Sequence, residues 1–371
     1  MIPALAGRHA PDPIASVETQ VLRIPFVDGG EGKGITPKRW NALDIVLLRV
    51  ETASGLVGWG EGFGYTCQNA TAQLLRDMVG PWAIGRDSVD PAQVNRDGQL
   101  AFHLFGRFGI TIFALSALDT ALWDIAAKRK GVSLSRLLGE RVRESVRAYA
   151  SLVRYGTPDL VRHFSEKALS EGYTDLKLHE IEEACIAAGR AAAPDATITV
   201  DANCQIGRER MLAMAPFLEA QRIDWLEEPT FPPEDTGPWQ EAAALGLSIA
   251  AGENLCTLEG FAPLIPSLAV VQPSVTKVGG ITEFLRVVGA VRATGKRLAP
   301  HSPYFGPGYW ATLQLAATLP EFDLFEVLYV EPEAWCGLAA PLVKGGAIAI
   351  PDLPGIGFEP DPAVVAKYRT G

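Results

Sequence analysis

Short apolar runs that end in a polar residue recur at a nearly constant interval through the second part of the chain. They end near Ser151, His179, Asp201, Glu227, Glu253, Ser274, His301 and Glu326. From His179 onward the intervals are 22, 26, 26, 21, 27 and 25 residues, which suits one strand, one helix and two loops. Eight such units predict an α/β barrel of the TIM type, (β/α)₈ or (β/α)₇β, over residues 141–339.

The first part of the chain has a different pattern. Three β-rich runs separated by turns cover residues 14–26, 43–51 and 56–61. Helical periodicity follows at about 69–83, 88–98 and 110–130, where Gly131 ends it. We therefore expect an N-terminal α+β capping domain over residues 14–140. Residues 340–371 carry Pro and Gly where a ninth unit would need a helix, and we expect them to pack back on the capping domain.

Composition excludes several classes of partner and cofactor. The net charge is −10 with a pI of about 5.1, and no basic run is present, which argues against nucleic acid or anionic membrane. The five cysteines are far apart and include no CxxC pair, and the N-terminus lacks a signal-peptide pattern. The apolar run FGITIFALSAL is too short to span a bilayer. The glycine clusters GEGKGI and GWGEGFG lack nucleotide-binding spacing. We expect a cytoplasmic protein with no nucleotide cofactor.

Carboxylates follow three consecutive predicted strands, TITVDAN, IDWLEEP and LSIAAGEN. Adjacent strands lie about 5 Å apart, so inward carboxylates at Asp201, Glu227 and Glu253 would repel one another unless a cation lay among them. Oxygen ligands without a thiol favour Mg²⁺. Each carboxylate could instead cap the helix that follows its strand, but the regular spacing favours one metal site. In WLEEP, Glu227 and Glu228 point to opposite faces of a strand, so only one of them can face the metal.

Further ionisable residues are expected at the same rim of the barrel. Lys177 and His179 are two residues apart on one strand and share a face, which suggests a proton-transfer pair beside the metal. His301 reaches the rim from the opposite side, five strands later. A hydrogen-bonded structural histidine is the alternative for His301.

Taken together, these motifs resemble the enolase superfamily, and within it the mandelate racemase-like group of the mandelate racemase/muconate lactonizing enzymes. ALDTALWDIAAKRKGVSLSRLLG is similar to the junction between capping domain and barrel, and VDAN, WLEEP and AAGEN are similar to the three metal-ligand strands. KVGGITE and PHSPYFGPG are similar to the sixth and seventh strand regions. The resemblance covers nearly the whole chain.

The resemblance implies a role for each rim residue. It implies that Asp201, Glu227 and Glu253 hold one Mg²⁺, while Glu228 turns away to a structural role. It implies that Lys177 contacts the substrate carboxylate and that His179 occupies the base position. His301 would be the acid/base on the other face, and Glu326 would hydrogen-bond the substrate carboxylate. Asn203, two residues after Asp201, could contact a substrate hydroxyl.

Two positions depart from the family pattern. His179 stands where a second Lys is usual, and Ser274 stands where an Asp usually pairs with the histidine of the seventh strand. We expect the Ser274 hydroxyl to lie within hydrogen-bond reach of His301. Without a carboxylate partner, the ring of His301 should be neutral at pH 7 and available as a base, with His179 as its proton-transfer partner.

The implied chemistry is Mg²⁺-dependent removal of the proton alpha to a carboxylate through an enediolate. Dehydration of a sugar acid to a 2-keto-3-deoxy acid is the favoured reaction. Racemisation or epimerisation is the alternative, and a non-catalytic barrel is a remote one. A cycloisomerase is disfavoured because no lysine occupies position 274.

We expect a small anionic carboxylate as ligand and a homo-oligomer as the assembly. The segments 27–41 and 61–67 should close over the mouth of the barrel, where Arg39 and Tyr65 are candidates to contact the substrate. Both residues could equally lie on the surface of the lid.

Overall fold

The computed structural model describes residues 10–30 and 40–370. The capping domain begins with an antiparallel sheet of β1 (Ile14–Val27), β2 (Ala42–Thr52) and β3 (Val57–Gly62). Helical segments follow: α1 (Gln68–Leu74), the π-helical turn η1 (Leu75–Val79), α2 (Gly80–Ala83), α3 (Pro91–Ala101), the 3₁₀ turn η2 (His103–Phe105), α4 (Ile110–Lys130) and α5 (Leu134–Leu138).

Both faces of the capping sheet are covered, which explains why β2 is an almost continuous apolar run. Val46, Leu48 and Val50 pack on the helices of the capping domain, while Leu43 and Ile45 belong to the core shared with the barrel. The sheet therefore joins the two parts of the molecule.

Helix α4 lies directly on β3. A side chain at Gly60 would place its Cβ 1.9 Å from the carbonyl oxygen of Ala117, so the close approach requires glycine. The helix ends at Gly131, whose left-handed φ of 68° is the usual C-terminal stop. By length and composition α4 could cross a membrane. We predicted otherwise from the sequence, because we counted only the 11 residues of the apolar run FGITIFALSAL. However, 89% of its most apolar window is buried inside the protein. It is the central helix of the capping-domain core.

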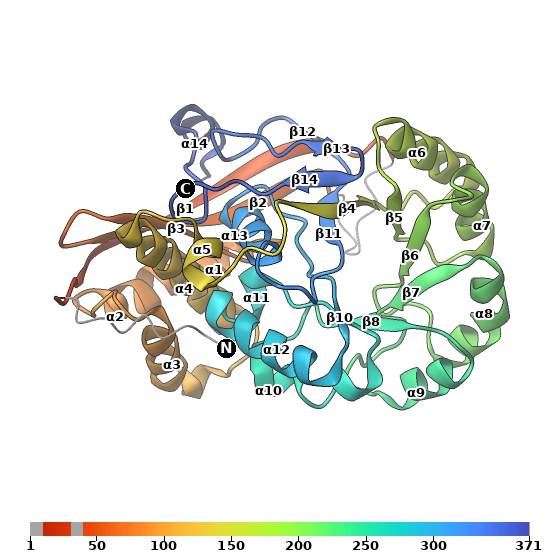
Figure 1. Cartoon of the computed structure of the whole chain (residues 1–371), viewed down its shortest axis with the longest axis horizontal. Helices are drawn as coiled ribbons and strands as arrows, with labels where there is room; N and C mark the ends of the chain where they lie inside the picture. Colours follow the sequence, from red (N-terminus) through yellow and green to blue (C-terminus); the bar gives the residue numbers. More distant parts are fainter. Residues whose placement is uncertain (1–9, 31–39, 371) are drawn as a thin grey trace.

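The second part of the chain is the predicted barrel (Figure 1). Its eight parallel strands are β4 (Ser145–Leu152), β5 (Asp175–Leu178), β6 (Thr197–Asp201), β7 (Ile223–Glu227), β8 (Ile249–Ala251), β9 (Val270–Val271), β10 (Arg297–Leu298) and β11 (Phe325–Leu328). Strand β11 pairs with β4, and a bridge between Leu298 and Phe322 closes the ring. The fold predicted from the spacing is confirmed.

Helices surround this ring on the outside (Figure 1). They are α6 (Pro158–Ser170), α7 (Glu183–Ala192), α8 (Arg208–Ala220), α9 (Gly237–Ala244), α10 (Thr257–Phe261), α11 (Val275–Val278), α12 (Gly280–Thr294) and α13 (Pro307–Ala316), with a 3₁₀ turn η3 (Ile265–Ser267). Inside the ring, a separate apolar cluster that includes Tyr149, Trp225 and Leu324 fills the barrel axis. This packing leaves the carboxyl ends of the strands as the place for polar side chains.

Two segments cross the expected domain boundaries. Strand β12 (Glu331–Pro332) falls in the range assigned to the barrel but pairs with the edge strand β1 of the capping sheet. The tail first forms a hairpin of β13 (Val343–Lys344) and β14 (Ala347–Ala349), and β14 pairs with β4 of the barrel. The tail was expected to pack back on the capping domain, and this pairing with the barrel was not predicted. The free edge of β4 near its N-terminus explains the difference, because it offers unpaired backbone groups.

Beyond this hairpin the tail does pack on the capping domain. The backbone N–H of Ile356 donates to Asp124 on α4, and Trp59 on β3 donates its indole N–H to Glu359. Helix α14 (Pro362–Tyr368) lies beside β1, where Figure 1 also shows the C-terminus. All five cysteines lie in the described part of the chain and are free.

Candidate active site

Three carboxylates meet at the carboxyl ends of three neighbouring strands. Asp201 ends β6, Glu227 ends β7, and Glu253 lies two residues beyond β8. The sheet register pairs Asp201 with Glu227 directly. One oxygen from each side chain lies within 4.8 Å of the others, and all three residues are buried. We call this group the carboxylate trio.

The buried carboxylates of the trio lie close enough for their negative charges to repel one another, which suits a bound cation. Burial and the neighbouring charge of Asp201 raise the pKa of Glu227 well above its ordinary value. Burial also opposes the charge on Asp201, but the hydrogen bond with His179 keeps the pKa of Asp201 below its ordinary value. The buried oxygen Oδ2 of Asp201 lies 3.2 Å from Nε2 of His179 and 3.7 Å from Nζ of Lys177. A hard divalent ion fits this donor set, because it would bind three carboxylate oxygens and relieve their repulsion.

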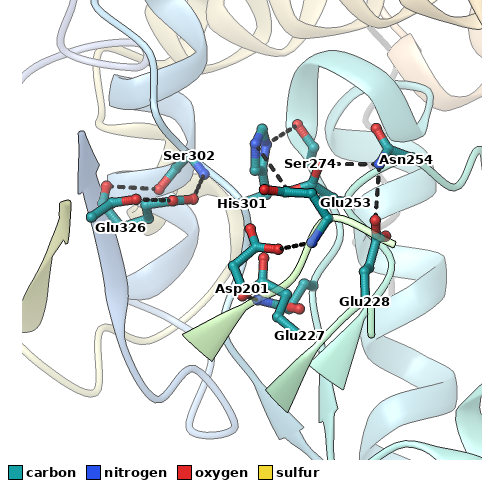
Figure 2. Close-up of polar contacts among 12 residues, drawn as sticks. Asp201, Glu227, Glu228, Glu253, Asn254, Ser274, His301, Ser302 and Glu326 are labelled. Atoms are coloured by element: carbon teal, nitrogen blue, oxygen red, sulfur yellow. Dashed lines mark hydrogen bonds and ion pairs between the residues drawn. The ribbon is translucent and has the colours of Figure 1, made fainter. Parts of the chain in front are cut away.

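The adjacent glutamates of WLEEP have different partners, but they do not point to opposite faces of a strand as predicted, because β7 ends at Glu227. In Figure 2 Glu227 lies with Asp201 and Glu253, the other members of the trio, while Glu228 points toward Asn254. The amide of Asn254 donates to Glu228 over 3.2 Å. Glu228 has a left-handed φ of 36° and lines a cavity rather than the outer face of the barrel. Burial and the nearby carboxylate of Glu253 raise the pKa of Glu228 to about 8.

The side chain of Lys177 is fully buried within this group of acids. Its Nζ lies 2.8 Å from Glu326, 3.1 Å from Glu227 and 3.7 Å from Asp201. Burial disfavours the ammonium form, but the charges of Glu227 and Glu326 outweigh it and raise the pKa of Lys177 well above its ordinary value. The lysine therefore places a fixed positive charge at the rim of the barrel.

His179 shares the face of Lys177, as predicted. Its Nδ1 lies 2.5 Å from the carbonyl oxygen of Leu152, and its Nε2 lies 3.2 Å from Asp201 Oδ2. Because only an N–H can pair with a carbonyl oxygen, Nδ1 carries a hydrogen. The other ring nitrogen faces the carboxylate trio.

His301 stands on the other side of the trio, three residues after β10. Its Nε2 lies 3.4 Å from Glu253, and its Nδ1 lies 3.4 Å from the Ser274 hydroxyl, within the expected reach. The Tyr304 hydroxyl is nearer to Nδ1, at 3.1 Å. Burial, and then the charge of Lys277, hold the pKa of His301 well below its ordinary value. The neutral ring expected from the sequence is the form that this environment favours.

Glu326, at the second position of β11, is held by its neighbours. One oxygen accepts from the Ser151 hydroxyl at 2.8 Å. The other accepts from the backbone N–H of Ser302 at 3.0 Å (Figure 2). Burial favours its protonated form, but the charge of Lys177 dominates and lowers the pKa of Glu326. Glu326 is thus an ionised partner of Lys177.

Two cavities that share several lining residues adjoin these groups. The smaller, of about 80 Å³, is lined by Lys177, His179, His301 and Glu326 together with Asn203. The larger, of about 280 Å³, extends under the capping domain and includes Asn203, Tyr65 and the segment around Phe63. The expected position of segment 61–67 over the barrel mouth is therefore observed. Of segment 27–41, Trp40 lines both cavities, whereas Arg39 lies outside the described residues.

Three residues of the site were missed by the sequence analysis. Lys277 is buried, and its Nζ donates to Asn254 at 3.0 Å and lies 3.9 Å from Glu253. Arg154 crosses the rim and donates to the carbonyl oxygen of His179 and to the side chain of Asn203. Tyr304 contacts His301. Two of these residues could have been found from the sequence by their nearness to predicted strand ends, since Lys277 follows Ser274 by three residues and Tyr304 follows His301 by three residues.

Comparisons with known proteins give the class of this one. Residues 38–139 match the N-terminal domain of the mandelate racemase/muconate lactonizing enzyme family, and residues 159–364 match the enolase C-terminal domain-like family. The chain therefore belongs to the mandelate racemase/muconate lactonizing enzyme family of the enolase superfamily.

Curated relatives identify the kind of enzyme. The chain is 31% identical to D-galactarolactone cycloisomerase of Agrobacterium fabrum, over 87% of this chain and 91% of the relative. It is 31% identical to D-galactonate dehydratase of Ralstonia nicotianae, over 89% and 91% of the two chains. A solved structure of an enolase superfamily member from Agrobacterium tumefaciens is similar with a TM-score of 0.85 and 28% identity, over 97% of this chain and 100% of that one. This protein is accordingly an enzyme of the lyase or isomerase class.

Proposed function

We propose that this enzyme dehydrates a sugar acid to a 2-keto-3-deoxy acid, using one Mg²⁺ held by the carboxylate trio. One observation carries the proposal: His179 and His301 reach the same small cavity from opposite sides of the barrel. The trio and Lys177 lie between them, so a substrate carboxylate bound there would have a proton-transfer group on either side. The names of the relatives, which include dehydratases of galactonate and arabinonate, support a sugar acid.

The first requirement is to stabilise charge on the substrate carboxylate when the adjacent C–H is broken. A bound Mg²⁺ would supply positive charge and Lewis acidity at that carboxylate. Lys177 adds a second positive charge, because its ammonium is buried and oriented by Glu326. Charges fixed before the reaction stabilise an enediolate without reorganising solvent.

The second requirement is to move two protons. His301 takes the hydrogen from C2, since its Nδ1 is occupied and its Nε2 lies at the cavity beside Glu253. The C3–O bond then breaks, and His179 delivers a proton to the leaving hydroxyl, which departs as water. The resulting enol becomes the ketone by proton transfer to C3. Both ring nitrogens of His179 face acceptors, so its geometry allows the ring to hold the proton it must give.

The remainder of the substrate would occupy the larger cavity. Arg154 donates to Oδ1 of Asn203, which leaves the amide N–H groups of Asn203 free to donate to a substrate hydroxyl. Trp40 Nε1 and Tyr65 Oη are buried polar atoms without a hydrogen-bond partner among the described residues. Buried donors are normally satisfied, so hydroxyl groups of a polyol chain are suitable partners for them. Contact between substrate and Arg39 stays a prediction.

Two other outcomes begin with the same C–H cleavage. Reprotonation of C2 by His179 would give epimerisation, because the two imidazoles approach from opposite sides. Cycloisomerisation is the second alternative, and the similarity to a cycloisomerase supports it. Position 274 holds a serine, but Lys277 lines the larger cavity and brings a lysine to this side of the site.

The test is to incubate the enzyme with a panel of aldonic acids, aldaric acids and their lactones in D₂O, with and without Mg²⁺. NMR would follow exchange at C2, and a carbonyl reagent would detect 2-keto acids. Dehydration predicts Mg²⁺-dependent formation of a 2-keto-3-deoxy acid. Exchange with inversion at C2 and no ketone would indicate an epimerase, and a lactone consumed without loss of water would indicate a cycloisomerase. No reaction on any acid would contradict the proposal.

A further inference from the structure

His301 is held on its inner side by hydroxyl groups. The Tyr304 hydroxyl lies 3.1 Å from Nδ1, and the Ser274 hydroxyl lies 3.4 Å from the same atom. The two hydroxyls also contact each other directly, and Ser274 lies 3.4 Å from the hydroxyl of Thr276. All three hydroxyl-bearing residues are buried. Among the described residues, Nδ1 has no carboxylate partner.

Tyr304 is placed to orient the imidazole as well as to pair with it. The chain turns after His301, with the N–H of Tyr304 donating to the carbonyl of Ser302 at 2.8 Å. This turn sets the phenol ring edge-to-face against the imidazole, with centroids 5.7 Å apart at 78°. At 3.4 Å, Ser274 is too distant to hold the ring firmly by itself.

We propose that Tyr304 is the positioning residue of His301 and that Ser274 supports it, so that hydroxyl groups fix the imidazole in place of a carboxylate. A hydroxyl can donate or accept, whereas an ionised carboxylate only accepts. His301 can act as a base through Nε2 only when the neutral ring carries its hydrogen on Nδ1, so Tyr304 accepts from Nδ1 and donates to Ser274. After Nε2 has taken the proton, Nδ1 still carries its hydrogen and the same contacts hold. The run of hydroxyls therefore keeps the ring in the tautomer that leaves Nε2 free to act, and it buries no additional charge.

If Tyr304 acts only through His301, then removing its hydroxyl should slow the proton transfer and leave metal and substrate binding nearly unchanged. In the described part of the chain the Tyr304 hydroxyl has hydrogen-bond partners at His301 and Ser274 and none in the carboxylate trio. The hydroxyl should therefore affect the removal of the C2 proton far more than it affects metal or substrate binding. This inference rests on the proposed function, in which His301 is the base.

The direct test is Tyr304→Phe, which keeps the ring and removes only the hydroxyl. We expect kcat to fall by about 10- to 100-fold, part of the contribution of a positioned base, with KM and Mg²⁺ affinity changed less than about threefold. The rate of C2 hydrogen exchange should fall with kcat. Ser274→Ala should have a smaller effect in the same direction. Tyr309→Phe is the matched control, because Tyr309 is also buried but lies outside both cavities, and its hydroxyl has no hydrogen-bond partner among the described residues. It should leave kcat unchanged.

A second readout does not need substrate. In protein labelled with ¹⁵N-histidine, with His301 assigned by its loss in His301→Asn, the Nδ1 resonance should shift in Tyr304→Phe and stay in place in Tyr309→Phe. A parent protein that exchanges C2 hydrogen, together with an unaffected Tyr304→Phe, would overturn this inference alone. A parent that exchanges no hydrogen on any acid would overturn the proposed function. The resonance comparison would then decide the positioning role by itself: a shift supports it, and no shift overturns it.

Discussion

At the scale of single residues, neighbouring side chains of one type have different environments. Glu227 and Glu228 are adjacent in sequence, but the first joins the carboxylate trio and the second accepts a hydrogen bond from Asn254. The strand ends between them, and the left-handed backbone of Glu228 turns its side chain along the rim. Metal affinity should therefore distinguish the two positions.

We expect Glu227→Gln to weaken Mg²⁺ binding by about 100-fold or more, since one of three anionic ligands is removed. Glu228→Gln should retain Mg²⁺ binding within about tenfold, because the amide oxygen can still accept from Asn254. Titration calorimetry on the two variants measures both affinities, and circular dichroism checks their folding. Equal losses of affinity would show that Glu228 is also a ligand.

His301→Asn tests the base. Asparagine keeps a polar side chain but cannot take the proton, so turnover should fall by at least about 10³-fold. Calorimetry should still detect Mg²⁺ binding, because the trio is intact. Turnover at the parental rate would leave Lys177 and His179 to carry the chemistry and would reject the role given to His301.

At the scale of elements, helix α4 of the capping domain is joined to α12 of the barrel by a small buried network. Asp119 accepts from the N–H of Thr282 at 2.8 Å and from its hydroxyl at 2.6 Å. The same hydroxyl accepts from the indole N–H of Trp123 at 2.9 Å. Gly280 allows this contact, since a Cβ there would lie 2.4 Å from Asp119.

Thr282→Val should lower the free energy of unfolding by about 2–4 kcal/mol, because it leaves a carboxyl oxygen and an indole N–H buried without a partner. Thr120→Val is the control on α4, since the Thr120 hydroxyl is buried and has no hydrogen-bond partner in the described part of the chain. It should be neutral or slightly stabilising. Urea unfolding of both variants measures the difference. Equal effects would show that the network contributes nothing beyond packing volume.

At the scale of the whole molecule, the capping domain closes the site and is held to the barrel by buried acids. Glu61 on β3 accepts from the N–H of Gly308 at the start of α13 over 2.8 Å. Burial raises the pKa of Glu61 to about 8, that of Asp119 to about 7 and that of Asp124 to about 6. Glu61 and Asp119 lie where the capping domain meets the barrel, and Asp124 lies where it meets the C-terminal tail.

These pKa values make stability depend on pH with a definite sign. A carboxyl group whose pKa is raised on folding binds a proton in the folded state that the unfolded chain has released. Its stabilisation is complete below the unfolded value of about 4.3 and is lost as pH rises toward the folded value. For Glu61 the window runs up to about 8, and one proton gives a slope of about 1.4 kcal/mol per pH unit.

Glu61→Gln should therefore reduce the decline of the unfolding free energy between about pH 5 and 8 by up to that slope. Asp119 and Asp124 remain in both proteins, so the difference between variant and parent isolates Glu61. Urea unfolding at several pH values provides the measurement. Identical pH profiles for the two proteins would refute the assignment. Assembly into a homo-oligomer is a separate expectation, and it stays a prediction.

Much of the fold and of the carboxylate trio could be predicted from the sequence alone. The regular interval between polar strand ends implied a barrel, and in a barrel of parallel strands every carboxyl end meets at one rim. Residues as distant as Lys177, Asp201 and His301 were therefore placed together without knowledge of any contact. Strand alternation correctly singled out Glu227 as the member of the trio, but it wrongly placed Glu228 on the opposite face, because the strand ends at Glu227 and Glu228 lines the cavity.

Other features were decided only by the tertiary structure. Whether Tyr304 or Ser274 is the nearer partner of His301 depends on how the chain turns after β10, and no periodicity encodes that turn. Lys277 and Arg154 reach the site across loops, and β14 joins β4 across almost 200 residues of chain. A repeating pattern fixes which rim a side chain reaches, because strand geometry is regular. Its partners there depend on loop conformations and on packing between distant segments, which are not regular.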